Sequence, residues 1–352
     1  MLDPRVDRLQ RIAATKRGVV SLAGALPARE LIPQAELARV LAEVARREEA
    51  LQYGWVEGTA SLRAWIADRL RARGAKIDAD RVIVTAGAQQ ALAITASVLG
   101  GGDKTVTVGD ATYPGALDAF GYGGLRAVER DGAIQYVMPG VSNPHGVDLG
   151  IDDAGGTIIA DEAYTELRFD GRTPRPRLAD ADARVWHIGT ISKTIAPGLR
   201  VGWLIAPTEA HAAALEAKQA MDLQSASLSQ EALARLLAAF DFDAHLARVR
   251  ACYADRAAAL TQALRRHAPA LRFREPEGGF SVWAELDDAM DEVALLAAAL
   301  REGVMVDPGS AFRPDRRGPL AVRIGFAHAA PETLVEGARR LACAIGAGPR
   351  SS

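Results

Sequence analysis

Hydrophobic residues recur at helical spacing over residues 33–47 and again over 60–73. Between these segments lies the glycine- and aromatic-rich stretch LQYGWVEGTA, which predicts a loop joining two helices. The segment RVIVTAGAQQALAITASVLG predicts a short strand, a glycine-containing turn over 85–87, and a helix that ends at the glycines 100–102.

Further short apolar runs are typical of buried strands, at residues 105–108, 133–137, 157–160, 185–188 and 201–205. Because strands that are apolar throughout are covered on both faces, these runs predict a parallel sheet between two layers of helices. Residues 209–265 have an alanine-rich, helical pattern. The remaining sequence alternates strands with a helix over 291–302, which indicates a smaller α/β domain.

Composition narrows the class of protein. The chain has 352 residues, of which 49% are hydrophobic, and a formal net charge of -2, so neither nucleic acid nor an anionic membrane is an expected partner. The two cysteines, Cys252 and Cys343, have no metal-ligand spacing, and we expect no metal. The start MLDPRVDRLQ lacks the apolar core of a signal peptide. These features predict a soluble, cytoplasmic protein.

One lysine has an unusual setting. Only 5 of the 42 basic residues are lysines, and Lys193 lies in the mostly small and apolar run GTISKTIAPGLRVGW. Burial disfavours the charged form of an amine, and a neutral amine can condense with a carbonyl to form a Schiff base. The aldehyde of pyridoxal phosphate is such a carbonyl. The alternative for a single lysine is an ordinary position on a surface loop.

Two other segments offer what that cofactor needs. Gly87, Ala88 and Gln89 join a predicted strand to a helix, where free backbone N–H groups favour an anion such as a phosphate. Asp161 ends an apolar strand, where a carboxylate requires a partner such as a pyridinium N–H. The alternatives are a glycine needed only for backbone geometry and an aspartate that caps a helix.

A group of motifs, in this order, resembles the class I/II pyridoxal-phosphate aminotransferases of fold type I. The motifs are VSLAGALPARELIP, LQYGWVEGTASLRAWIA, TAGAQQAL, ATYPGAL, VSNPHG, ADEAYTEL and GTISKTIAPGLRVGW. Within the superfamily, the chain is similar to the branch of 2-aminoadipate aminotransferases and of the catalytic domains of MocR-type regulators. The resemblance extends from about residue 20 to residue 328.

The resemblance implies roles for individual residues at the cofactor. Lys193 would form the Schiff base and move the proton between Cα and the cofactor, with Asp161 on the ring nitrogen and Tyr113 stacked on the ring. Asn143 and Tyr164 would hydrogen-bond the phenolic oxygen. The phosphate would be bound at the Gly87 turn by groups of Ala88, Gln89, Thr190, Ser192 and Arg200.

The resemblance also implies a substrate site and a second subunit. Arg323 in LAVRIGFA would bind the substrate carboxylate, for which its planar fork is suited, although a surface arginine is the alternative. Gly24 would let the backbone lie close over the substrate, and Asn143 would lie beside it. Tyr53 would reach the phosphate of the neighbouring subunit, which implies a homodimer with shared active sites.

The implied architecture is a large doubly wound sheet domain with a smaller α/β domain. We assign residues 1–44 to an N-terminal segment of the small domain, 45–235 to the large cofactor-binding domain and 236–352 to the small domain. The cofactor is expected between them, at the carboxyl ends of the strands.

The sequence departs from the family pattern in two places. His145 stands where the family usually has a threonine, and we interpret it as a solvated loop histidine. The connections from Tyr113 to Asn143 and on to Asp161 are short, so a crossover helix before Asp161 must be short or absent. Such trimming could expose one flank of the sheet or leave a surface for another protein.

The expected reaction moves an amino group from an L-amino acid to a 2-oxo acid. An alternative keeps the cofactor but makes the enzyme a lyase, a decarboxylase or a cyclase of a specialised pathway, because shared motifs do not reveal which bond is broken. A third possibility is a non-catalytic sensor, as in MocR-type regulators. No helix-turn-helix segment precedes the aminotransferase-like region of this sequence, which speaks against a DNA-bound regulator.

Overall fold

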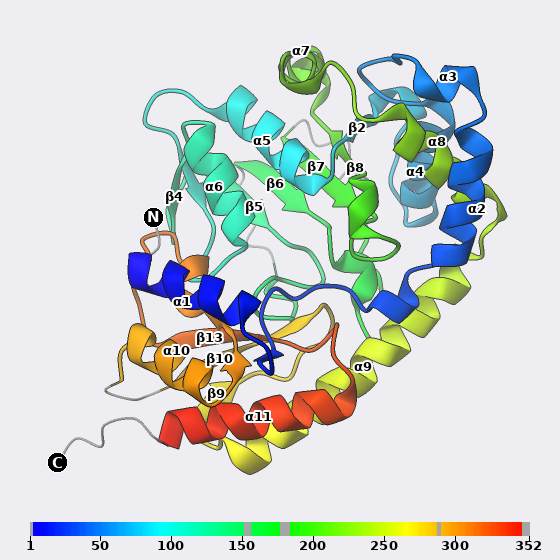
Figure 1. The fold of residues 1–352 in the computed structure, drawn as a ribbon. Coiled ribbons are helices and arrows are strands. Elements are labelled where there is room, and N and C mark those ends of the chain that lie inside the picture. Colours follow the sequence, from blue (N-terminus) through cyan, green and yellow to red (C-terminus); the bar gives the residue numbers. More distant parts are fainter. Residues whose placement is uncertain (1–2, 151–155, 177–183, 287–289, 347–352) are drawn as a thin grey trace.

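A seven-stranded sheet forms the centre of the larger part of the molecule (Figure 1). The computed structural model describes residues 3–150, 156–176, 184–286 and 290–346. The strands lie in the order β2 (Ile83–Thr85), β8 (Gly202–Ile205), β7 (Val185–Thr190), β6 (Thr157–Asp161), β5 (Ile134–Val137), β3 (Thr105–Thr107) and β4 (Arg126–Val128).

The sheet is mostly parallel, as predicted, but β8 runs antiparallel to both of its neighbours, β7 and β2. The chain passes from β7 to β8 through residues 191–201, which contain no crossover helix, so it returns in the opposite direction. Each predicted apolar run is a strand. The sequence pattern did not predict β4, a short edge strand with one exposed and two half-buried residues.

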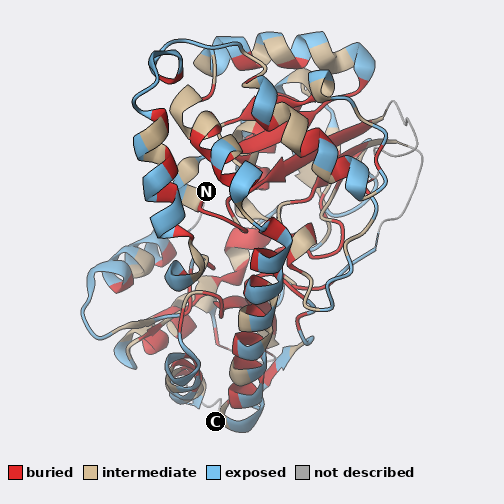
Figure 2. Ribbon diagram, turned by 90° about the vertical axis from the view of Figure 1, so that its right-hand side faces the viewer, coloured by how far each residue is buried: buried red, intermediate tan, exposed pale blue. Residues whose placement is uncertain are grey.

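Helices cover both faces of the sheet. One face presents Ile83, Ile159 and Ile188 to α5 (Ala88–Leu99), α6 (Pro114–Tyr122) and α7 (His211–Asp222). The other face presents Val84 and Trp203 to α4 (Ala60–Ala72) and α8 (Ser227–Ala239), and α2 (Gln34–Val44) packs on α8. Figure 2 shows the strands as a buried layer between helices whose outer faces are exposed.

The predicted helices are present, with shorter bounds. The segments 33–47 and 60–73 contain α2 and α4, with α3 (Glu48–Leu51) at the start of the connecting loop. The long segment 209–265 forms α7, α8 and the 26-residue helix α9 (Phe242–His267). The pattern did not predict α1 (Pro4–Thr15), α6 or α11 (Pro331–Gly346).

A smaller antiparallel sheet forms the second part, in the order β12 (Asp307–Pro308), β13 (Ala321–Gly325), β10 (Ser281–Leu286) and β9 (Leu271–Phe273). The helix α11 packs on α9, and both α1 and α11 pack on α10 (Glu292–Arg301) (Figure 1). The N-terminal strand β1 (Val20–Ser21) pairs with β11 (Val304–Met305). This pairing brings the N-terminal segment beside the small sheet. The assigned domain boundaries remain predictions.

The connection from β5 to β6 contains no helix in its described part, residues 138–150 and 156. The trimmed connection does not expose the strands beside it, because Ile158, Ala160 and Val185 are buried. The remainder of this crossover, 151–155, lies outside the described residues, as do 177–183 of RTPRPRLADADAR and 347–352 of the tail. No helix within the described ranges has the length and hydropathy needed to cross a membrane.

Candidate active site

A cavity that opens to solvent, with about 500 Å³ of space including its mouth, lies at the ends of β6 and β7 and at the turn after β2. Ten residues that the sequence singled out line it: Ala88, Gln89, Tyr113, Asn143, Asp161, Tyr164, Thr190, Ser192, Lys193 and Arg200. Met138 and Ala163 complete the lining. Ligands of open α/β sheets bind at this edge, because the strand ends present side chains and free backbone groups there.

Lys193 lies in the turn that follows β7 and is half-buried. Its neighbours Ile191 and Ile195 are buried in the core and fix the turn. The Lys193 Nζ lies 5.4 Å from the ring centroid of Tyr164 and 5.9 Å from that of Phe280. The amine therefore lies against aromatic rings and borders the cavity.

One end of the cavity can hold an anion. Gly87 has φ 82° and caps α5, so the first N–H groups of the helix have no partner within it. The Arg200 guanidinium lies against this turn, where its Nη2 donates to Ala86 O at 3.1 Å. A Cβ at position 87 would lie 2.6 Å from that Nη2, so only glycine lets the arginine approach.

Polar side chains extend this end of the cavity. Thr190 Oγ1 lies 2.9 Å from Ser192 Oγ and accepts from the Ser192 amide at 3.1 Å. Gln89 donates from Nε2 to Gly115 O at 2.7 Å and accepts from the Tyr113 hydroxyl at 3.2 Å. Burial raises the pKa of Tyr113 to about 12, so its phenol stays protonated at neutral pH.

Asp161 is a buried carboxylate at the end of β6. Its Oδ2 accepts from the Tyr136 hydroxyl at 2.8 Å, and its Oδ1 accepts from the Ala163 amide at 3.0 Å. Burial raises the pKa of Asp161, and these two hydrogen bonds and the nearby Lys193 oppose that effect. A cationic N–H donor in the cavity would stabilise the ionised form. Tyr136 was not predicted, although a hydroxyl in an otherwise apolar strand indicates that it needs a hydrogen-bond partner.

The three predicted substrate residues, Arg323, Asn143 and Gly24, lie together beside the small sheet. Arg323 donates from Nη1 to Asn143 Oδ1 at 3.0 Å, which links β13 to the cavity. Arg323 also forms an ion pair with Asp307, 2.7 Å from Nη2 to Oδ2, and the carboxylate of Asp307 accepts from the Gly24 amide. Asp307 was not predicted. Its signal is an acid between a buried valine, Val306, and a proline.

Tyr53 does not line the cavity. It lies on the loop between α3 and α4 with 78% of its surface exposed, next to Trp55, which is 79% exposed. Two large aromatic side chains exposed on one loop are unusual for a free surface.

The prediction for His145 was wrong. The residue is on a loop, but only 13% of its side chain is exposed, and its ring centroid lies 5.8 Å from that of Trp283. Burial lowers the pKa of His145, although Asp110, 3.7 Å from Nε2, raises it. An imidazole, which is larger than a threonine side chain, fits here because Trp283 provides an aromatic surface.

No cluster of metal-ligating side chains occurs in the parts of the chain that the structure describes.

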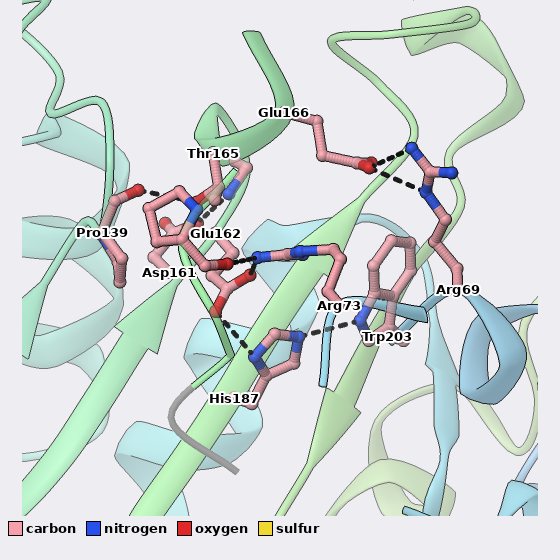
Figure 3. A network of polar contacts seen from close by, with 11 residues as sticks. Arg69, Arg73, Pro139, Asp161, Glu162, Thr165, Glu166, His187 and Trp203 are labelled. Carbon is pink, nitrogen blue, oxygen red and sulfur yellow. Dashed lines mark hydrogen bonds and ion pairs between the residues drawn. The ribbon is translucent and has the colours of Figure 1, made fainter. Parts of the chain in front are cut away.

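A second polar network is built around Glu162, the residue that follows Asp161 (Figure 3). Glu162 forms an ion pair with Arg73 Nη2 at 2.6 Å and lies 3.4 Å from His187 Nδ1. Trp203 donates from Nε1 to His187 Nε2 at 3.2 Å. Because an indole N–H can only donate, the proton of a neutral His187 must be on Nδ1, toward Glu162. The network joins α4 to strands β6, β7 and β8.

One family model matches this sequence. The family described as aminotransferase class I and II matches residues 141–341. The 2-aminoadipate transaminase of Thermus thermophilus is 32% identical over 366 residues, which cover 93% of this chain and 90% of that protein. The probable rhizopine catabolism regulatory protein MocR of Rhizobium meliloti is 30% identical and covers 91% of this chain, but the match spans 71% of the regulator.

A solved structure shares the fold. Pyrococcus horikoshii kynurenine aminotransferase, crystallised in complex with PMP, has a TM-score of 0.91 and 27% identity, covering 100% of this chain and 96% of that chain. The family match, the relative above 30% identity and the shared fold agree with one another. The chain therefore belongs to the class I and II aminotransferases and is a pyridoxal-phosphate-dependent enzyme of fold type I.

Proposed function

We propose that the cavity binds pyridoxal 5'-phosphate, that Lys193 forms the covalent bond to it, and that the enzyme carries an amino group from an L-amino acid to a 2-oxo acid. The observation that carries this proposal is the convergence of three groups on one cavity. They are the amine of Lys193, the buried carboxylate of Asp161 and the start of α5 after the turn at Gly87, where Ala88 lines the cavity.

The donor set fits the cofactor. The turn at Gly87 leaves room for the Arg200 guanidinium, and a phosphate there would accept from Arg200, from the start of α5 and from the hydroxyls of Thr190 and Ser192. The carboxylate of Asp161 would accept from a protonated ring nitrogen. Asn143 and Tyr164 would hold the phenolic oxygen.

Bound pyridoxal phosphate would supply an aldehyde that condenses with amines and a ring that accepts electrons from the substrate carbon. The protein's residues do the rest. Asp161 would keep the ring nitrogen protonated, and the Lys193 amine would remove and return the proton at Cα. Tyr113, which lines the cavity, would cover the ring and exclude water. Arg323 receives the carboxylate of the amino acid through its guanidinium.

The proposal includes a cytoplasmic homodimer with shared sites. Tyr53 and Trp55 would be covered by a second copy, and Tyr53 would reach the phosphate of that copy's site. The exposure of both aromatic rings supports this, since an uncovered pair would be an aggregation hazard. Cys252 and Cys343 are both free, as is usual in a reducing compartment.

The first test replaces the amine at the cavity. Lys193→Arg and Lys193→Ala are compared with the wild type and with Lys104→Ala, which removes an exposed lysine elsewhere. After incubation with pyridoxal phosphate and reduction by borohydride, we expect the label in a peptide containing residue 193. Both variants at position 193 should lose the label. Their rate of amino transfer to 2-oxo acids should fall by at least about a hundredfold.

Labelling of a different lysine, or full activity of Lys193→Ala, would contradict the assignment. Release of ammonia or of carbon dioxide in place of a stoichiometric 2-oxo acid would instead contradict amino transfer while leaving the cofactor site intact.

A further inference from the structure

The groups that we expect to bind the substrate carboxylate already hold a carboxylate of the protein. Asp307 Oδ2 accepts from Arg323 Nε at 2.9 Å and from Nη2 at 2.7 Å. The two oxygens of Asp307 also accept from the Gly24 amide, at 3.2 and 3.0 Å. Only 9% of the Arg323 side chain and 16% of the Asp307 side chain are exposed.

The backbone builds this arrangement. Asp307 lies opposite Arg323 in the antiparallel pair of β12 and β13, so their side chains lie on the same face of the small sheet. The pairing of β1 with β11 brings Gly24 to the same place from the N-terminal segment. The Arg323 guanidinium carbon lies 4.6 Å from the ring centroid of Phe312, which fixes the plane of the fork.

The contacts divide the five N–H donors of Arg323. Asp307 takes Nε and one hydrogen of Nη2, and Asn143 takes one hydrogen of Nη1. One hydrogen on each terminal nitrogen is left, so a substrate carboxylate could bind only the far edge of the guanidinium. The substrate carboxylate would also meet the ion pair of Arg323 and Asp307, which has no net charge, in place of a free cation. A carboxylate therefore gains less here than at an unpaired arginine.

We propose that Asp307 is a specificity-determining residue that relaxes the requirement for an α-carboxylate, so that primary amines serve as amino donors beside α-amino acids. This rests on the role that the proposed function gives to Arg323. With an amine, R–CH2–NH2 and a 2-oxo acid yield R–CHO and the corresponding amino acid. The donor carbon loses a proton and its bond to nitrogen, takes an oxygen from water and is oxidised to the aldehyde. C2 of the oxo acid accepts the amino group and is reduced.

The test uses donors that differ only in the carboxylate. The matched pairs are L-phenylalanine with 2-phenylethylamine, L-leucine with 3-methylbutylamine and L-lysine with cadaverine, each reacted with the holoenzyme. We expect kcat/KM of the wild type for at least one amine to lie within about tenfold of that for its amino acid. In Asp307→Asn, the ratio of amino acid to amine should rise at least about tenfold through a lower KM for the amino acid, with the amine unchanged.

Glu292→Gln is the matched control, because Glu292 accepts from the Ser310 amide in the same small domain and makes no contact with Arg323. A wild type that converts amino acids but none of the amines, or an unchanged ratio in Asp307→Asn, would overturn the inference. Asp307→Ser provides the same comparison if the asparagine variant does not fold.

Arg323→Lys separates this inference from the proposed function. Loss of activity toward amino acids in Arg323→Lys, together with an unchanged ratio in Asp307→Asn, leaves Arg323 its role and refutes that of Asp307. If Arg323→Lys retains the wild-type KM for amino acids, the role of Arg323 itself is wrong, and the inference about Asp307 fails with it.

Discussion

Asp161 is a single residue at which stability and function oppose each other. The residue is 4% exposed, and among the described residues its carboxylate accepts two hydrogen bonds, from the Tyr136 hydroxyl and the Ala163 amide. An ionised carboxylate at such a position costs free energy until a cation pairs with it. We infer that this cost in the cofactor-free protein contributes to the affinity for a protonated ring nitrogen.

The prediction is that Asp161→Asn stabilises the cofactor-free protein by about 1 kcal/mol near neutral pH. Burial raises the pKa of Asp161 in the folded state. Protonated Asp161 therefore contributes fully to the free energy of unfolding below the carboxyl pKa of the unfolded chain. This contribution is lost as the pH rises through the raised pKa of the folded state. In urea unfolding, the free energy of unfolding of the variant should increase relative to that of the wild type as the pH rises. The affinity of the variant for pyridoxal phosphate should fall.

Tyr136→Phe is the companion variant, since it removes one hydrogen bond to the carboxylate and keeps the ring. It should destabilise the protein where Asp161 is ionised. An Asp161→Asn protein that unfolds more easily than the wild type at every pH would show that the carboxylate stabilises the fold, contrary to this account.

The site residues that could be predicted from the sequence are those that lie on short local motifs. Ten of the predicted residues line one cavity, because most of their motifs follow a strand or begin a helix at the same sheet edge. Tyr136 and Asp307 were missed because their partners are set by pairing between strands distant in sequence. Local pattern contains no record of such register. His145 was misjudged for the same reason, because Trp283 covers it from another element.

At the scale of elements, the network around Glu162 ties four of them together. Arg73 follows the C-terminus of α4, Glu162 follows β6, His187 belongs to β7 and Trp203 to β8 (Figure 3). Burial alone would raise the pKa of Glu162, but His187 and Arg73 together lower it. The ionised carboxylate is therefore the form that the fold stabilises.

We expect Glu162→Gln to lower the free energy of unfolding by about 3 kcal/mol, because Arg73 then keeps a buried charge without its counter-ion. Since the folded-state pKa of Glu162 is depressed, its contribution is present above the ordinary carboxyl pKa and is lost as the pH falls through the lower value. The difference between wild type and variant should therefore shrink in acid, as measured by denaturant unfolding.

The control for this prediction is an exposed pair. Arg39 and Glu43 lie one turn apart on α2, with 58% and 42% of their side chains exposed. Arg39→Ala should change the free energy of unfolding by no more than about 0.5 kcal/mol, because water and salt screen the pair. If Glu162→Gln and Arg39→Ala change the free energy of unfolding equally, burial does not make the ion pair of Glu162 stronger than the exposed pair.

Helices and strands were predictable where the residue pattern of a single segment indicates the element. The strands in apolar runs and helices such as α5, which ends before glycines, follow from spacing alone. The direction of β8 does not, because an apolar run has the same pattern in either orientation. The edge strand β4 was missed because it is short and partly exposed, so it lacks the apolar signature of a central strand.

At the scale of the whole molecule, the exposed loop before α4 is the feature that a single chain does not explain. Tyr53 and Trp55 are mostly exposed, as are Leu51 beside them and Leu223 after α7. An apolar group of this kind is typical of a surface that another protein covers. Under the proposed homodimer, the same surface contributes Tyr53 to the neighbouring site, so assembly and activity depend on each other.

The last prediction uses that dependence. Tyr53→Ala should weaken cofactor binding and activity, and Lys193→Ala should abolish activity. In a heterodimer of the two variants, one site has both defects and the other has neither, because each site would take Lys193 from one subunit and Tyr53 from its partner. Refolding an equal mixture should therefore restore up to about a quarter of the wild-type activity.

Tyr122→Ala is the matched control for exposure, since this tyrosine on α6 is also exposed but belongs to no proposed interface. A mixture of Tyr122→Ala with Lys193→Ala should give only the activity of the Tyr122→Ala subunits. If the mixture of Tyr53→Ala with Lys193→Ala recovers nothing beyond the sum of its parts, each subunit must complete its own site. The exposure of Tyr53 would then need a partner other than a second copy of this chain.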